Sequence, residues 1–173
     1  MDHKQTSFGS GVVLLTLSKI LTLTISLFSV MLLSRYRTLE EYGTYSAILM
    51  VVNLALPLFL LGFPNALNFF YPRAETLLDR DRFLSTYFVS TTTLAILAGV
   101  VLYLLSPLLG RFFSNSNMFQ FSFLLVILPW TKAMTESRGN LLIASGQAKK
   151  LVVITLAQNL LLLIAVLMTR WLG

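Results

Sequence analysis

Long apolar runs separated by short polar segments repeat along the whole chain. The runs cover residues 11–34, 44–71, 83–110, 118–144 and 151–172. A helix needs about 20 mainly apolar residues to cross the hydrocarbon core of a bilayer, and every run is at least that long. The pattern therefore predicts an all-α fold: a polytopic membrane helix bundle of about five transmembrane helices, forming a single membrane domain over residues 1–173.

Two of the runs carry features that affect how their helices pack. The second is interrupted by Pro57, Gly62 and Pro64. Proline removes a backbone donor and kinks a helix, and such a break is tolerated in a membrane only against protein or a cavity. In the third run, Ala95 and Gly99 have the small-xxx-small spacing that allows two helices to approach closely.

Composition agrees with a membrane protein and excludes several kinds of chemistry. The chain is 56% hydrophobic and 12% charged, whereas a soluble domain has about 25% charged residues. It has no cysteine, and its one histidine, His3, lies in the N-terminal tail, so a Cys or His metal cluster is not expected. Asp79 and Asp81 match a three-residue glycosyltransferase motif, but so short a match is weak evidence, and we interpret the segment as a solvated loop. Without a nucleotide-binding or hydrolase motif, we expect no enzymatic activity and no cofactor.

The positive charge of the chain indicates membrane topology and contact with lipid headgroups. The net charge is +6, and no soluble basic domain is present to bind nucleic acid. With the N-terminus inside, the cytoplasmic segments carry Lys4, Arg73, Arg80, Arg82, Lys149 and Lys150, and the outer segments carry Arg35, Arg37, Arg111 and Arg170. Because Lys and Arg are enriched on the cytoplasmic side, we expect a cytoplasmic N-terminus.

Polar and ionisable residues lie on one face of several predicted helices. Residues three or four apart share a helix face, and the fourth run places Lys132 and Glu136 on the side of Pro129. The further candidates are Lys19 in the first run, Asn53 and Asn68 in the second, and Gln158 and Asn159 in the fifth. Ionisable groups at membrane depth are costly and usually face a bundle interior or a water-filled cavity. We therefore expect a polar, net-cationic cavity.

A purely structural role is also open for each candidate. Polar side chains in membrane helices often form interhelical hydrogen bonds. Lys19 can extend its long side chain to the interface instead of lining a cavity. Lys132 and Glu136 can form a neutralised pair, although their position beside a proline favours a functional role.

Three segments resemble a known family of membrane proteins. They read Arg35-Tyr-Arg-Thr-Leu-Glu-Glu-Tyr-Gly-Thr-Tyr45, Leu61-Gly-Phe-Pro-Asn-Ala-Leu67 and Ala144-Ser-Gly-Gln-Ala-Lys-Lys150. In this order they are similar to segments of the bacterial polysaccharide-export and O-antigen flippases, which belong to the multidrug/oligosaccharidyl-lipid/polysaccharide exporter superfamily. Members have about 12 to 14 helices in two related bundles. The resemblance implies that this chain is most of the first bundle, as an N-terminal fragment.

The resemblance also implies a function. The family moves lipid-linked saccharides, usually undecaprenyl-pyrophosphate-linked oligosaccharides, across the bacterial inner membrane for surface polysaccharide biosynthesis. Lys19 and Lys132 would attract the pyrophosphate or acidic sugars, and Glu136 would tune Lys132 or couple transport to protons. The amides of Asn53, Asn68, Gln158 and Asn159 would bind sugar hydroxyls, and Pro57 and Pro64 would let the second helix bend. Expected partners are this substrate, membrane lipids and polysaccharide polymerase or export proteins.

Two alternatives stay open. A cation-coupled multidrug exporter of the same superfamily would move small organic cations instead of lipid-linked sugars. A non-transporting five-span partner, or a truncated product, of a polysaccharide export system would not transport by itself.

Overall fold

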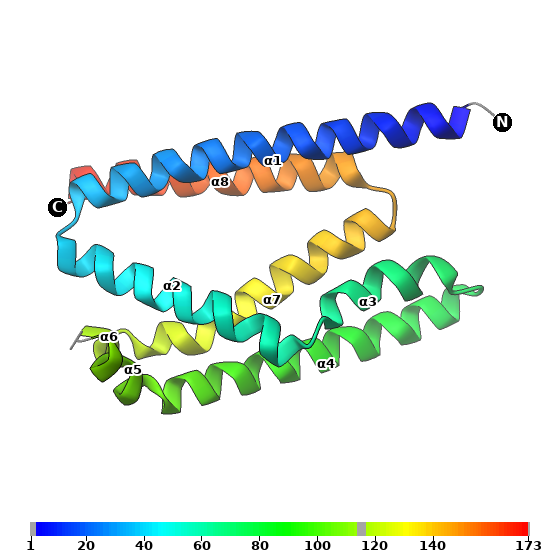
Figure 1. The fold of residues 1–173 in the computed structure, drawn as a ribbon. Coiled ribbons are helices and arrows are strands. Elements are labelled where there is room, and N and C mark those ends of the chain that lie inside the picture. Colours follow the sequence, from blue (N-terminus) through cyan, green and yellow to red (C-terminus); the bar gives the residue numbers. More distant parts are fainter. Residues whose placement is uncertain (1–2, 114–116, 173) are drawn as a thin grey trace. The chain divides into compact units, whose positions relative to one another are not determined.

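The chain folds into helices joined by short turns. The computed structural model describes residues 3–113 and 117–172 (Figure 1), and these residues contain no β-strand. The elements are α1 (His3–Tyr36), α2 (Leu39–Leu60), α3 (Phe63–Phe70), the 3₁₀ helix η1 (Tyr71–Arg73), α4 (Leu77–Leu104), α5 (Ser106–Phe112), α6 (Asn117–Gln120), α7 (Ser122–Ala144) and α8 (Ala148–Leu172). The all-α prediction is confirmed.

Four of the described helices are long and apolar enough to cross a membrane. They are α1 over Leu15–Tyr36, α2, α4, and α8 over Ala148–Met168. The 23-residue helix α7 corresponds to the predicted fourth span, but it is not one of the four. It carries Lys132, Glu136 and Arg138, and charged residues oppose insertion into hydrocarbon. A helical membrane bundle is thus confirmed, and α7 carries three charged residues within it.

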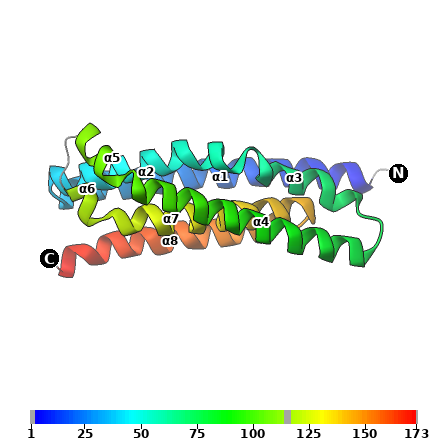
Figure 2. The ribbon, with the colours of Figure 1, turned by 90° about the horizontal axis from the view of Figure 1, so that it is seen from below.

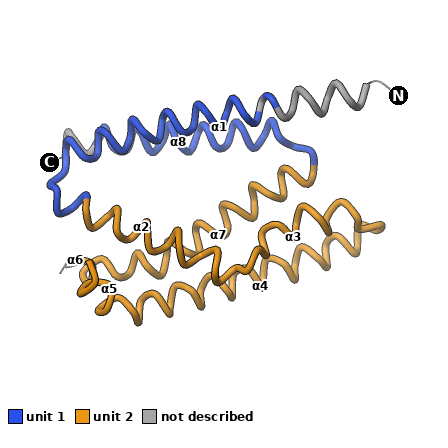
Figure 3. The backbone as a smooth tube through the Cα atoms, viewed as in Figure 1, with its two compact units in different colours: residues 1–42, 146–173 blue, residues 43–145 orange. Residues whose placement is uncertain are grey.

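Contacts divide the chain into two compact units, shown in different colours in Figure 3. The first comprises residues 1–42 and 146–173, in which α1 packs along α8. Most of its described apolar side chains, such as Leu27 and Val153, are exposed, while Ser29 and Val152 are buried. An apolar surface of this kind suits contact with lipid tails.

The second unit, residues 43–145, has the larger core. Here α4 packs along α7, and α3 also lies against α7 (Figure 2). One buried cluster contains Ala47, Ile48, Val52, Leu102, Met118 and Leu125, and the other contains Leu56, Leu60, Ala95 and Ala133. Because α2 contributes to both clusters together with α4 and α7, these three helices form the framework of the unit.

The small residues of α4 allow a close approach to α7. Ala95 is fully buried, and a Cβ atom added to Gly99 would lie 2.8 Å from the carbonyl oxygen of Val126 and 3.0 Å from its Cα. Side chains larger than hydrogen therefore cannot be placed there without moving one helix. The packing predicted from the small-xxx-small spacing is confirmed.

The second apolar run breaks at Gly62, one of the three expected positions, and not at Pro57. Pro57 lies inside α2, where the amide of Leu61 still donates to the carbonyl of Pro57 (3.0 Å). The break is at Leu61 and Gly62, which both adopt positive φ angles of 46° and 75°. Pro64 lies in the first turn of α3, a position where its missing N–H costs nothing. The prediction that both prolines break the helix was wrong.

The third run begins earlier than predicted and ends in a separate helix. Helix α4 begins at Leu77 instead of Phe83, because the Thr76 side chain accepts a hydrogen bond from the amide of Asp79 (3.1 Å) and caps the helix. It ends at Leu104, and Ser106–Phe112 forms α5. The charged segment expected as a loop is therefore partly the first turn of a membrane helix.

Candidate functional site

Helix α7 presents its charged residues at the surface of the second unit. Lys132 and Glu136 are both exposed, and Pro129 of the same helix is buried. Lys132 and Glu136 lie in the described part of the chain, yet no ion pair joins them. The neutralised pair that their spacing allowed is not formed in this structure, and the Lys132 ammonium is left to contact other groups.

A pocket of about 240 Å³ lies beside Lys132, between α2 and α7 of the same unit. Its lining residues are Leu49 and Val52 from α2, and Leu128, Thr131, Lys132 and Thr135 from α7. The wall is mostly apolar, and its polar residues are Thr131, Lys132 and Thr135. An apolar wall with a few convergent polar groups is typical of a ligand-binding site.

The polar groups of the pocket have a defined hydrogen-bonding character. The Thr131 hydroxyl donates to the carbonyl of Leu128 (3.1 Å), and the Thr135 hydroxyl donates to the carbonyl of Thr131 (2.8 Å). Since each hydroxyl has one hydrogen, both oxygens are left as acceptors. The Lys132 ammonium is a donor only. The pocket thus offers a positively charged donor and two acceptors.

Two asparagines attach the broken second helix to α7. The Asn140 side-chain amide donates to the carbonyl of Pro64 (3.1 Å), and Asn68 donates to the Oδ1 of Asn140 (3.5 Å). Of the candidates, Asn68 therefore takes part in an interhelical contact, which is a structural role. Asn53 is exposed on α2, next in sequence to Val52, but it does not line the pocket.

Tyr87 joins three elements in the interior of the second unit. Its hydroxyl lies 2.9 Å from the Oγ of Ser137 on α7, and both side chains are buried. Its ring stacks on Phe63 of α3, with ring centroids 5.5 Å apart. One turn further along α4, the buried Thr91 hydroxyl has no hydrogen-bond partner within the described residues. These contacts fix α3 and α4 against each other and α4 against α7.

The remaining candidates belong to the first unit. Lys19 on α1 and Gln158 on α8 are exposed. The side-chain amide of Asn159 donates to the carbonyl of Thr155 in its own helix (2.8 Å). The structure brings none of them to the pocket residues within one unit, so a cavity shared by all seven polar candidates stays a prediction.

The pocket includes residues that sequence reasoning missed. The helix face assigned to Lys132 contained Pro129 and Glu136, whereas the residues that line the pocket are Leu128, Thr131 and Thr135. Together with Lys132 they are spaced by three, one and three residues, which also describes one helix face, so the signal was present in the sequence. The contribution of Leu49 and Val52 depends on the packing of α2 near α7, which no local pattern reveals.

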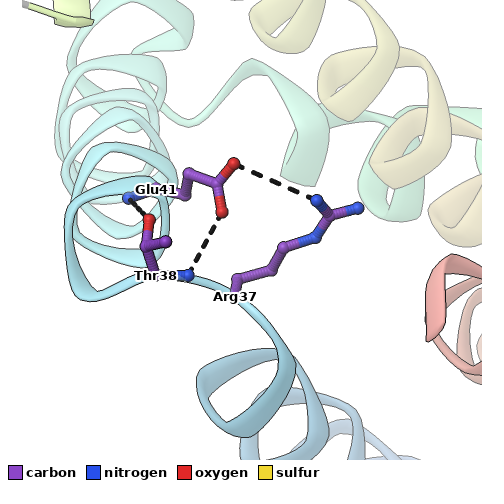
Figure 4. Close-up of polar contacts among 3 residues, drawn as sticks. All are labelled: Arg37, Thr38 and Glu41. Carbon is purple, nitrogen blue, oxygen red and sulfur yellow. Dashed lines mark hydrogen bonds and ion pairs between the residues drawn. The ribbon is translucent and has the colours of Figure 1, made fainter. Parts of the chain in front are cut away.

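The turn between α1 and α2 has a well-defined hydrogen-bonded structure (Figure 4). The Thr38 hydroxyl accepts from the amide of Glu41, and the Glu41 carboxylate accepts from the amide of Thr38, both at 3.2 Å. The guanidinium of Arg37 lies 4.0 Å from the same carboxylate. This reciprocal capping box begins α2 and lies in the first segment of the family resemblance.

A family model described as polysaccharide biosynthesis protein matches residues 32–173, which contain this turn, the pocket and all three resembling segments. The chain belongs to this family. No curated protein and no solved structure matches the chain. Membership confirms the predicted kinship with polysaccharide-export proteins. With its apolar helices, it identifies a membrane protein of polysaccharide synthesis.

Proposed function

We propose that this polysaccharide biosynthesis family member is a flippase. It moves a polyisoprenoid-linked saccharide across the bacterial inner membrane. The family resemblance implies that this substrate is an undecaprenyl-pyrophosphate-linked oligosaccharide. The protein lies in that membrane with a cytoplasmic N-terminus and works together with polysaccharide polymerase or export proteins. No covalent step is assigned to it, and no cofactor is required.

One observation carries the proposal: an unpaired lysine lies beside a pocket on a helix of an apolar bundle. A charge at membrane depth is costly, and such residues mark substrate or ion pathways. Lys132 has no carboxylate partner among the described residues, so its ammonium is free to donate to a substrate. This supports transport of a polar, oxygen-rich group more than a role in scaffolding alone.

The broken second helix supports a conformational role for the same unit. Leu61 and Gly62 separate α2, which helps to line the pocket, from α3, which is attached to α7 through Asn140. Hinges are a few residues at the ends of elements that absorb changes in backbone angle. We assign the bending role, expected for Pro57 and Pro64, to Leu61 and Gly62.

The test uses the protein reconstituted in vesicles with a fluorescent lipid-linked saccharide. Translocation is measured as the rate at which the label becomes accessible to a membrane-impermeant quencher. Replacing Lys132 with alanine removes a charged hydrogen bond worth about 1.5–3 kcal/mol, so we expect transport to fall about tenfold or more. The matched control is Lys149→Ala, an exposed lysine at the start of α8.

Two results would overturn the proposal. Wild-type vesicles in which the label becomes accessible no faster than in protein-free vesicles would exclude translocation of this substrate. Equal rates for wild type and Lys132→Ala, at equal amounts of inserted protein, would exclude the role of Lys132.

A further inference from the structure

The pocket between α2 and α7 is too small for an oligosaccharide. Its volume is about 240 Å³, below the range of roughly 300–1,000 Å³ of sites for drug-sized ligands. It therefore suits one sugar residue or one charged group of a larger substrate. Its polar groups decide between these two possibilities.

A pyrophosphate does not match the pocket. Its oxygens only accept hydrogen bonds. The hydroxyls of Thr131 and Thr135, two residues that line the pocket, already donate to backbone carbonyls, so their oxygens can only accept as well. Lys132 alone would have to compensate for several charged oxygens placed against an apolar wall. Burying charge without matching donors is costly.

An acetamido group matches each part of the pocket. Its carbonyl oxygen accepts from the Lys132 ammonium, its N–H donates to a threonine oxygen, and its methyl contacts the wall formed by Leu49, Val52 and Leu128. The hydroxyls of the attached sugar ring can donate to the second threonine oxygen. We propose that this pocket binds an N-acetylated amino sugar, with Thr131 and Thr135 as specificity-determining residues. The identification of this sugar as part of a transported substrate rests on the proposed function.

The test measures binding separately from transport. The purified full chain in micelles is mixed with methyl N-acetylglucosaminide, methyl glucoside or inorganic pyrophosphate, and saturation-transfer difference NMR gives relative affinities. We expect the acetylated sugar to bind best and its acetyl methyl protons to receive the strongest saturation, because they lie against leucine and valine methyls. Pyrophosphate should not displace it.

Three isosteric variants test the residues. Thr131→Val and Thr135→Val keep the side-chain shape but remove an acceptor, and each should weaken binding about two- to tenfold. Thr93→Val is the matched control, because Thr93 is exposed on α4, donates to the carbonyl of Val89 (2.9 Å) and does not line the pocket. It should bind the sugar like the wild type.

The outcomes of these measurements separate the sugar site from the proposed function. Equal binding of the acetylated and plain sugars, or unchanged binding in both threonine variants of the pocket, would overturn the sugar site. Displacement of the sugar by pyrophosphate would also overturn it. Selective sugar binding without any translocation in vesicles would support the sugar site and overturn the transport function.

Discussion

Replacing Gly99 with alanine should separate α4 from α7. The new Cβ would lie 2.8 Å from the carbonyl oxygen of Val126, 3.0 Å from its Cα and 3.3 Å from its carbonyl carbon. All three are backbone atoms, which move only if the whole helix moves. Overpacking typically costs about 1–3 kcal/mol, and a rigid backbone neighbour places this site in the upper half of that range.

The gain in helix propensity offsets part of this cost. Alanine is better than glycine in a helix by about 1 kcal/mol, so Gly99→Ala should be destabilised by about 1–2 kcal/mol in net terms. The assay is reversible unfolding of the purified protein in mixed micelles, followed by the loss of helical circular dichroism. The lowered midpoint gives the change in the free energy of unfolding.

Gly43→Ala is the control for this prediction. Gly43 lies in α2, and a Cβ added there would meet no atom within 4 Å. This variant should therefore be as stable as the wild type or slightly more stable. Wild-type stability of Gly99→Ala, or equal destabilisation of both variants, would refute the argument that close helix contact decides the outcome.

Three other changes test contacts elsewhere in the chain. Tyr87→Phe leaves the buried Ser137 hydroxyl without its partner and should lower the free energy of unfolding by about 1–3 kcal/mol. In a double-mutant cycle, adding Ser137→Ala should recover part of this loss. Thr38→Ala removes the cap of α2 and should cost about 0.5–2 kcal/mol, with faster hydrogen exchange at the Glu41 amide as the local measurement. Gly62→Ala places a side chain at φ 75° and should lower the unfolding midpoint by an amount equivalent to about 1–2 kcal/mol. An unchanged midpoint would show that alanine is not strained at this backbone angle.

Patterns local to one helix were sufficient for much of the fold. Apolar runs located the membrane helices, and the spacing of Ala95 and Gly99 identified the face that packs closely, because both depend only on residue size and helical period. The start of α4 was missed although Thr76 followed by Asp79 is a capping signal. The charged residues nearby indicate a loop instead.

The candidate site was harder to predict because it depends on two helices. Lys132 could be singled out from its charge in an apolar run, but its neighbours in the pocket could not be identified without knowledge of α2. The covalent structure of proline predicts a break at Pro57, yet the helix continues for one more turn before it breaks. The local energy of a proline does not determine where a chain bends when packing at Leu56 and Leu60 holds that turn in place.

The break at Leu61 and Gly62 also adjusts the protein to the thickness of its membrane. Helix α2 has 22 residues, or about 33 Å, which is close to the roughly 30 Å of the hydrocarbon core. A straight continuation through the 8 residues of α3 would add about 12 Å and create a hydrophobic mismatch. Bending at this point lets the surplus apolar segment pack on α7. Insertion of residues between α2 and α3 would thus be tolerated better than lengthening α2 itself.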